Sequence, residues 1–154
     1  MNEENFLKLA EKLDMTPQAE FDMEVFRGTR NEFGDLESEH YYSMENCGTV
    51  GCALGQAPLT RGLEPIAGDF EIEIYGSKKN LNYAAYGERI FGIISGEIWD
   101  FIFSSEWREV DNTPKGAAAR IRYLCKNGLP SEYMYDSKTV ALYMTEAIKE
   151  SRDE

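Results

Sequence analysis

The chain has 154 residues, 42% of them hydrophobic and 29% charged, which is the size and balance of a single globular domain. Its 28 acidic and 16 basic residues give a net charge of −12, which argues against direct nucleic-acid binding because a phosphate-backbone binder needs a basic face. The sequence has neither an apolar run long enough to span a membrane nor a secretory signal, and its three cysteines are an odd number. We therefore expect a cytoplasmic protein with reduced thiols and no membrane contact.

The N-terminal segment carries the first helical pattern. Apolar residues recur at helical spacing between charged ones, at Phe6, Leu9, Ala10 and Leu13. Pro17 disfavours helical geometry in the residue before it. The pattern predicts an N-terminal amphipathic helix over residues 3–14.

The central region, residues 21–76, reads as loops and strands. Apolar and acidic residues alternate over 21–26 and again over 69–75, which predicts two short strands. Residues 27–46 show no period and predict a surface loop, while residues 76–80 end the second strand. Because two isolated strands bury little surface, we expect them to pair in a small antiparallel sheet of two or three strands.

The C-terminal half, residues 81–150, reads as helical. One predicted helix closes near Gly92, and Ser95 can cap the next. Thr113 followed by Pro114 predicts a strong helix start, and Gly128 its end. A last helix is expected to be capped by Asp136 or Ser137 and to run to Ile148. Residues 1–154 are thus expected to form a single, mainly helical α+β domain.

The stretch from Cys47 to Gly55 is the first candidate for a functional site, since it holds two cysteines and three glycines in nine residues. Thr49 is a candidate N-cap, which would place Cys47 just before a helix. Exposed amides and the helix dipole at such a position favour negative charge and can hold an anion. The predicted ligand-binding residues are therefore Gly48, Thr49, Val50 and Cys52.

Three interpretations of this stretch remain open. In the first, Cys52 and the two residues after it pack a helix into the core, because free cysteine is among the most buried residue types. In the second, Cys47 is a nucleophile and His40, the only histidine, is its base. In the third, zinc would be bound by His40, Cys47, Cys52 and Cys125, but this spacing matches no zinc finger. We expect no metal and no cofactor.

Several segments together resemble a family of small uncharacterised proteins of tailed bacteriophages and prophages. That family carries a CGTxxCxxG motif and a downstream D-x-TP-x-x-AA helix. The resemblance runs through residues 21–23, 47–55, 86–93, 99–107 and 111–121. It implies an accessory protein working inside the host cytoplasm, and it implies no activity. This chain departs from the family pattern at Gly51, where relatives often have alanine, and at Gln56, where they have a bulkier residue.

These observations favour binding without catalysis. The expected function is that of a small acidic phage-type accessory protein that binds a host protein or a small anionic ligand, with counter-defence as one role. By analogy, such a protein can form a homodimer. The alternative is a cysteine-dependent hydrolase or transferase that uses Cys47 at a helix N-terminus.

Overall fold

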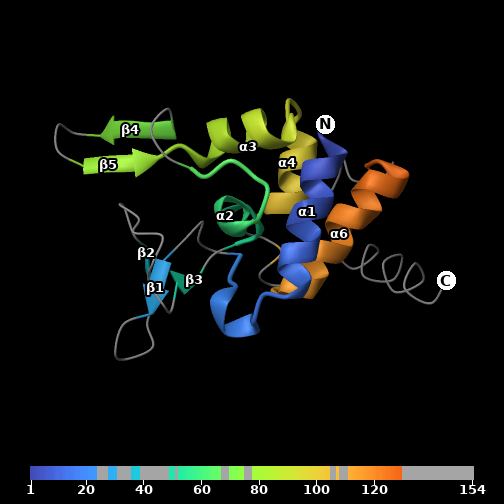
Figure 1. The fold of residues 1–154 in the computed structure, drawn as a ribbon, viewed down its shortest axis with the longest axis horizontal. Helices are drawn as coiled ribbons and strands as arrows, with labels where there is room; N and C mark the ends of the chain where they lie inside the picture. Colours follow the sequence, from blue (N-terminus) through green and yellow to red (C-terminus); the bar gives the residue numbers. More distant parts are fainter. Residues whose placement is uncertain are drawn as a thin grey trace.

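The fold is seen in a computed structural model of residues 1–154, shown in Figure 1. The structure describes main chain and side chains at residues 1–23, 52–66, 70, 82–104, 107 and 111–129. It describes the main chain alone at residues 28–30, 36–38, 49–50, 71–74 and 78–81. Among the described helices, none combines the length and the apolar character that crossing a bilayer requires.

The helices form the body of the molecule. The α-helices are α1 (Glu3–Asp14), α2 (Ala53–Gln56), α3 (Tyr83–Phe91), α4 (Gly96–Phe103) and α6 (Pro114–Asn127). Two short 3-10 helices are η1 (Gln18–Glu20) and η2 (Ala57–Leu59). Helices α1 and α6 lie side by side and make the most extensive helix–helix contact among the described elements (Figure 1).

The predicted N-terminal helix over residues 3–14 is confirmed as α1. Asn2 caps it, because its side-chain oxygen accepts a hydrogen bond from the amide of Asn5 at 3.2 Å. The backbone amide of Asn2 donates to the carbonyl of Phe91 at 2.7 Å, so the start of α1 is tied to the end of α3. The apolar positions of the pattern are the buried ones: Phe6, Leu9, Ala10 and Leu13.

The core is centred on three phenylalanine rings from three different helices. The ring centroid of Phe6 lies 4.6 Å from that of Phe91, and the Phe91 centroid lies 6.0 Å from that of Phe103. All three are buried, and such close tilted pairs favour one relative placement of α1, α3 and α4. The aromatic cluster thus fixes the helical body on which α6 packs.

The helix boundaries predicted in the second half are confirmed at three places. Helix α3 ends at Gly92, whose φ of 63° is left-handed and suits glycine. Helix α6 begins with Thr113 as N-cap and ends at Gly128, with φ of 77°. Ser95 precedes α4 as predicted, but its side chain makes no capping hydrogen bond.

The expected α+β class with one small antiparallel sheet is wrong. Where side chains are described, 67% of the residues are helical and none lies in a strand. The strands seen in the main chain are β1 (Gly28–Arg30), β2 (Leu36–Ser38), β3 (Thr49–Val50), β4 (Glu71–Ile74) and β5 (Lys78–Leu81). They form two separate ladders, in the orders β2-β1-β3 and β4-β5, at one side of the helical body (Figure 1).

The strand errors have local causes. Phe21 and Met23 are buried as their alternation suggested, but η1 precedes them, and the amide of Met23 donates to Oδ1 of Asn112, just before α6, so residues 21–23 do not form a strand. The predicted loop over 27–46 contains β1 and β2, so it is wrong there. The predicted strand at 69–75 contains β4, but β4 pairs with β5, placing Ile72 opposite Asn80. The helix predicted to run to Ile148 lies outside the described residues.

Two glycines provide a matched test of helix packing. A Cβ at Gly87 would lie 2.8 Å from Cζ3 of Trp99, so α3 and α4 approach closely there. A Cβ at Gly96 would meet no atom within 4 Å. We expect Gly87→Ala to lower the free energy of unfolding by about 1–3 kcal/mol, because Trp99 must shift.

The control, Gly96→Ala, should leave the free energy of unfolding unchanged or raise it by up to about 1 kcal/mol. Urea denaturation of both variants measures the difference. Equal effects of the two substitutions would contradict the close approach of α3 and α4.

Candidate functional site: the cationic face of α6

The predicted site at 47–55 is described only in part. Cys47, Gly48 and the alternative base His40 lie outside the described residues. Thr49 and Val50 form the short strand β3, which pairs with β1. The prediction that Thr49 caps the following helix is wrong, because the next helix, α2, begins three residues after Val50.

Cys52 has a structural place in the core. It is the N-cap of α2, and its Sγ accepts a hydrogen bond from the amide of Gly55 at 3.5 Å. Burial raises the pKa of the Cys52 thiol to about 11, against the lowering effect of nearby backbone amides. Cys52 is therefore a neutral thiol at pH 7, and the interpretation that it packs with Ala53 and Leu54 into the core is confirmed.

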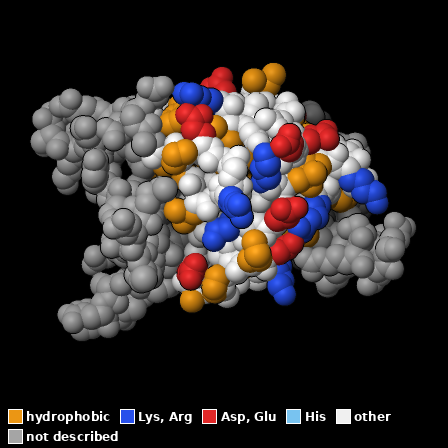
Figure 2. Space-filling model, in the orientation of Figure 1, with side chains coloured by type: hydrophobic (Ala, Val, Ile, Leu, Met, Phe, Trp, Pro, Cys, Tyr) orange, Lys and Arg blue, Asp and Glu red, His pale blue; other side chains and the backbone are white. Residues whose placement is uncertain are grey.

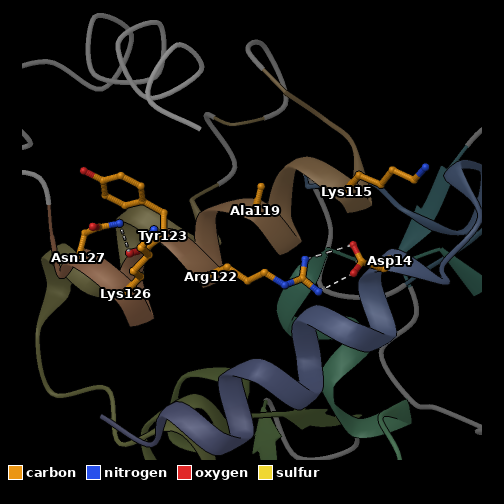
Figure 3. Close-up of a pocket in the computed structure, with 7 residues that line it drawn as sticks. All are labelled: Asp14, Lys115, Ala119, Arg122, Tyr123, Lys126 and Asn127. Carbon is orange, nitrogen blue, oxygen red and sulfur yellow. Dashed lines mark hydrogen bonds and ion pairs between the residues drawn. The ribbon is translucent and has the colours of Figure 1, made fainter. Parts of the chain in front are cut away.

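The structure shows a hollow on the outer face of α6 that the sequence interpretation missed. Its volume is about 720 Å³. One residue of α1 and six of α6 line it: Asp14, Lys115, Ala119, Arg122, Tyr123, Lys126 and Asn127 (Figure 3). Three of these carry a positive charge and one a negative charge, so the lining is cationic although the chain is strongly acidic.

An ion pair between α1 and α6 forms one wall of the hollow. Arg122 and Asp14 point toward one another in Figure 3, with Nη1 3.3 Å from Oδ1 and Nη2 2.5 Å from Oδ2. This is a bidentate pair, the geometry in which guanidinium recognises a carboxylate best. Both side chains are 43% exposed, so the pair remains within reach of dissolved anions.

The spacing along α6 places the three cations on one face. Lys115, Arg122 and Lys126 follow one another at intervals of seven and four residues. At 1.5 Å per residue they are separated by about 10 Å and about 6 Å along the helix axis. Such a row suits an extended ligand with several negative charges better than a single small ion.

A hydrogen-bonded junction fixes the start of α6. The Thr113 hydroxyl donates to Oδ1 of Asp111 at 2.5 Å and accepts from the amide of Gly116 at 3.0 Å. A Cβ at Gly116 would lie 1.8 Å from Oδ2 of Asp111, so the carboxylate occupies the space that any other residue would fill. The glycine is thus required by the close approach of the carboxylate.

The same junction holds the chain that follows α1. Oδ1 of Asn112 accepts from the amide of Met23 at 2.8 Å, and Nδ2 of Asn112 lies 3.3 Å from Oδ1 of the buried Asp22. The carbonyl of Asn112 accepts from Nε2 of Gln18 at 2.8 Å. One asparagine therefore fastens residues 18–23 to the beginning of α6.

A fully buried arginine lies one turn further along α6. Cζ of Arg120 is 4.0 Å from the centroid of the Trp107 ring, a cation–π contact. Its Nη1 is 3.4 Å from the carbonyl oxygen of Asp111 and 4.0 Å from Oδ2. Burial lowers the pKa of Arg120 to about 9, which leaves the guanidinium charged at neutral pH.

No family model matches the chain, and no curated protein or solved structure matches it. Among the residues whose side chains are described, no three histidine, cysteine or acidic groups lie together as metal ligands would.

The row of cations was visible in the sequence as a helical period of basic residues. The pairing of Arg122 with Asp14 had no comparable signal, because 108 residues separate them.

The burial of Cys52 predicts low reactivity. In the native protein at pH 7.5, a thiol reagent should modify Cys125 before Cys52, because Cys125 is only partly buried while Cys52 is 2% exposed and its pKa is about 11. Timed alkylation followed by peptide mass spectrometry measures each site separately. Labelling of Cys52 as fast as that of Cys125 would contradict the packing described above, and both should react at similar rates in urea.

Proposed function

We propose that the chain is a phage-type accessory protein that acts by binding in the host cytoplasm, and that the cationic hollow on α6 is its binding surface. The occupant is a small anionic ligand or an acidic segment of a host protein. The observation that carries this proposal is the concentration of Lys115, Arg122 and Lys126 in one hollow of a chain with net charge −12.

The charge distribution supports binding of an anion at this place. On a chain with excess negative charge, long-range electrostatics repel acidic partners, so a local group of cations is needed to hold one. Figure 2 shows basic and acidic side chains interspersed over the face that α1 and α6 share, with hydrophobic side chains in separate small patches. That face is consistent with polar recognition, whereas large apolar interfaces show contiguous apolar area.

The lining of the hollow also suggests how the ligand is recognised. Arg122 presents a planar fork that matches carboxylate and phosphate oxygens, and the lysines supply compact positive charges at both ends. Tyr123 adds an aromatic surface between them, and its ring lies 6.4 Å from the buried ring of Phe101. An aromatic wall between two cations suits an extended acidic chain.

Asp14 acts as an internal competitor in this proposal. It occupies the fork of Arg122, so a ligand carboxylate has to displace it or share the guanidinium. An exposed ion pair of this kind contributes only about 0.2–1 kcal/mol to stability, so its exchange for a ligand is inexpensive. Removal of the Asp14 charge should therefore strengthen ligand binding.

Charge variants test the proposal directly. The probe is a fluorescein-labelled hexaglutamate peptide, and the measurement is fluorescence anisotropy at low and physiological salt. We expect the triple variant Lys115→Gln, Arg122→Gln, Lys126→Gln to weaken binding by about tenfold or more, and Asp14→Asn to strengthen it by about threefold. Raising the salt concentration should weaken binding to the wild type, because it screens exposed charges.

The control is Arg61→Gln, which removes one positive charge, against three in the triple variant, at an exposed residue outside the hollow. It should leave the affinity for the peptide nearly unchanged. Competition with unlabelled citrate and inorganic phosphate separates a small-ligand site from a peptide site. Equal binding by wild type and triple variant, or an equal loss in Arg61→Gln, would overturn the proposal.

A further inference from the structure

Arg120 places a guanidinium inside the helical body, apart from the cationic hollow. Its side chain is fully buried and is the largest of the fully buried side chains among the described residues. Buried arginines are rare unless their donors are paired, because an isolated charge is costly in an apolar environment. The hydrogen-bond partners of Arg120 therefore indicate whether its charge is fully compensated.

The contacts of Arg120 use only one part of the guanidinium. The Trp107 ring covers its face, and in the described part of the chain only Nη1 has polar contacts, at 3.4 Å from the carbonyl oxygen of Asp111 and 4.0 Å from its Oδ2. The other two nitrogens, Nε and Nη2, are buried and have no hydrogen-bond partner among the described residues. These two nitrogens form one edge of the guanidinium, and their N–H bonds point in the same direction.

The neighbouring carboxylate does not satisfy this edge. Asp111 approaches Nη1 at 4.0 Å, and its oxygens are engaged by Thr113 and packed over Gly116. The junction at the start of α6 therefore holds the carboxylate in place for capping. Nε and Nη2 thus remain as a parallel pair of donors. Their spacing matches that of two oxygens of one carboxylate or phosphate group.

We propose that the Nε–Nη2 edge of Arg120 binds an oxyanion group, a carboxylate or a phosphate, beside the Trp107 ring that covers the face of the guanidinium. In this apolar setting a bidentate pair is strong and selects oxyanions over chloride, which cannot accept two parallel bonds in the same way.

The closed geometry has a kinetic consequence. Because Arg120 has no exposed surface, the anion enters only after a local opening of the chain around it. Association is then slower than diffusion, and it is limited by the opening rate at high anion concentration. This behaviour separates the Arg120 site from the open hollow, where the charges are already in contact with water.

The experiment measures thermal unfolding of the full chain in inorganic phosphate, in acetate and in chloride at equal ionic strength. In the wild type, an oxyanion at ten times its dissociation constant should raise Tm by about 3–6 °C relative to chloride. Arg120→Met keeps the apolar stem and removes the fork, and Arg120→Lys keeps a charge without the fork; both should lose the oxyanion-specific rise. Comparison of phosphate with acetate identifies the preferred group.

The triple variant of the hollow is the control, because it retains Arg120 and should keep the rise in Tm. Loss of the rise in the triple variant but not in Arg120→Met would assign the effect to the hollow and overturn this inference. If Arg120→Met does not fold, the ¹⁵N-labelled arginine Nε–H signal of the wild type reports the same contact. Its chemical shift should move in phosphate or acetate and not in chloride, and an unchanged shift would overturn the inference.

Discussion

The hydrogen bonds of Asp111, Asn112 and Thr113 form the constraint on which the position of α6 depends. Thr113 satisfies an amide of the first turn, and the Asp111 carboxylate lies over Gly116. Asn112 binds residues 18–23 at the same place, so the start of α6 is tied to the chain leaving α1. A buried amide without a hydrogen-bond acceptor costs free energy. The junction therefore stabilises the packing of α6 against residues 18–23 in addition to capping the helix.

The orientation of α6 decides which of its side chains become functional. With α1 packed on one face, Arg122 reaches Asp14 and lies between the two lysines on the solvent side. About 140° around the helix axis from this row, Arg120 points inward onto Trp107. A single helix thus presents an exposed cationic row and a buried guanidinium. The rest of the chain has an excess of acidic residues, so these positive groups stand out against a negative net charge.

Local signals in the sequence predicted the helices well and the strands poorly. Helix starts and ends depend on the backbone preferences of single residues, such as Thr113 with Pro114 and Gly92. These boundaries can therefore be predicted without knowledge of the tertiary structure. The alternation at Phe21 and Met23 indicated burial correctly, but η1 and Asn112 determine the conformation there.

The two cationic groups needed tertiary information. The period of Lys115, Arg122 and Lys126 was present in the sequence, but nothing local showed that α1 supplies Asp14. The burial of Arg120 depends on where Trp107 and Asp111 are placed by the segment that joins α4 to α6. The glycine-rich stretch at 47–55 drew attention because of its composition, whereas the cysteine in it that the structure describes packs in the core.

Hydrogen exchange in Asn112→Ala tests most directly whether the junction acts as one unit. The predicted result is that the amides of Met23 and Gly116 both exchange about tenfold faster than in the wild type, while the Gly92 amide at the end of α3 is unchanged. Faster exchange at Met23 alone, with Gly116 unaffected, would contradict the account, because the start of α6 would then be fixed independently of the chain that follows α1.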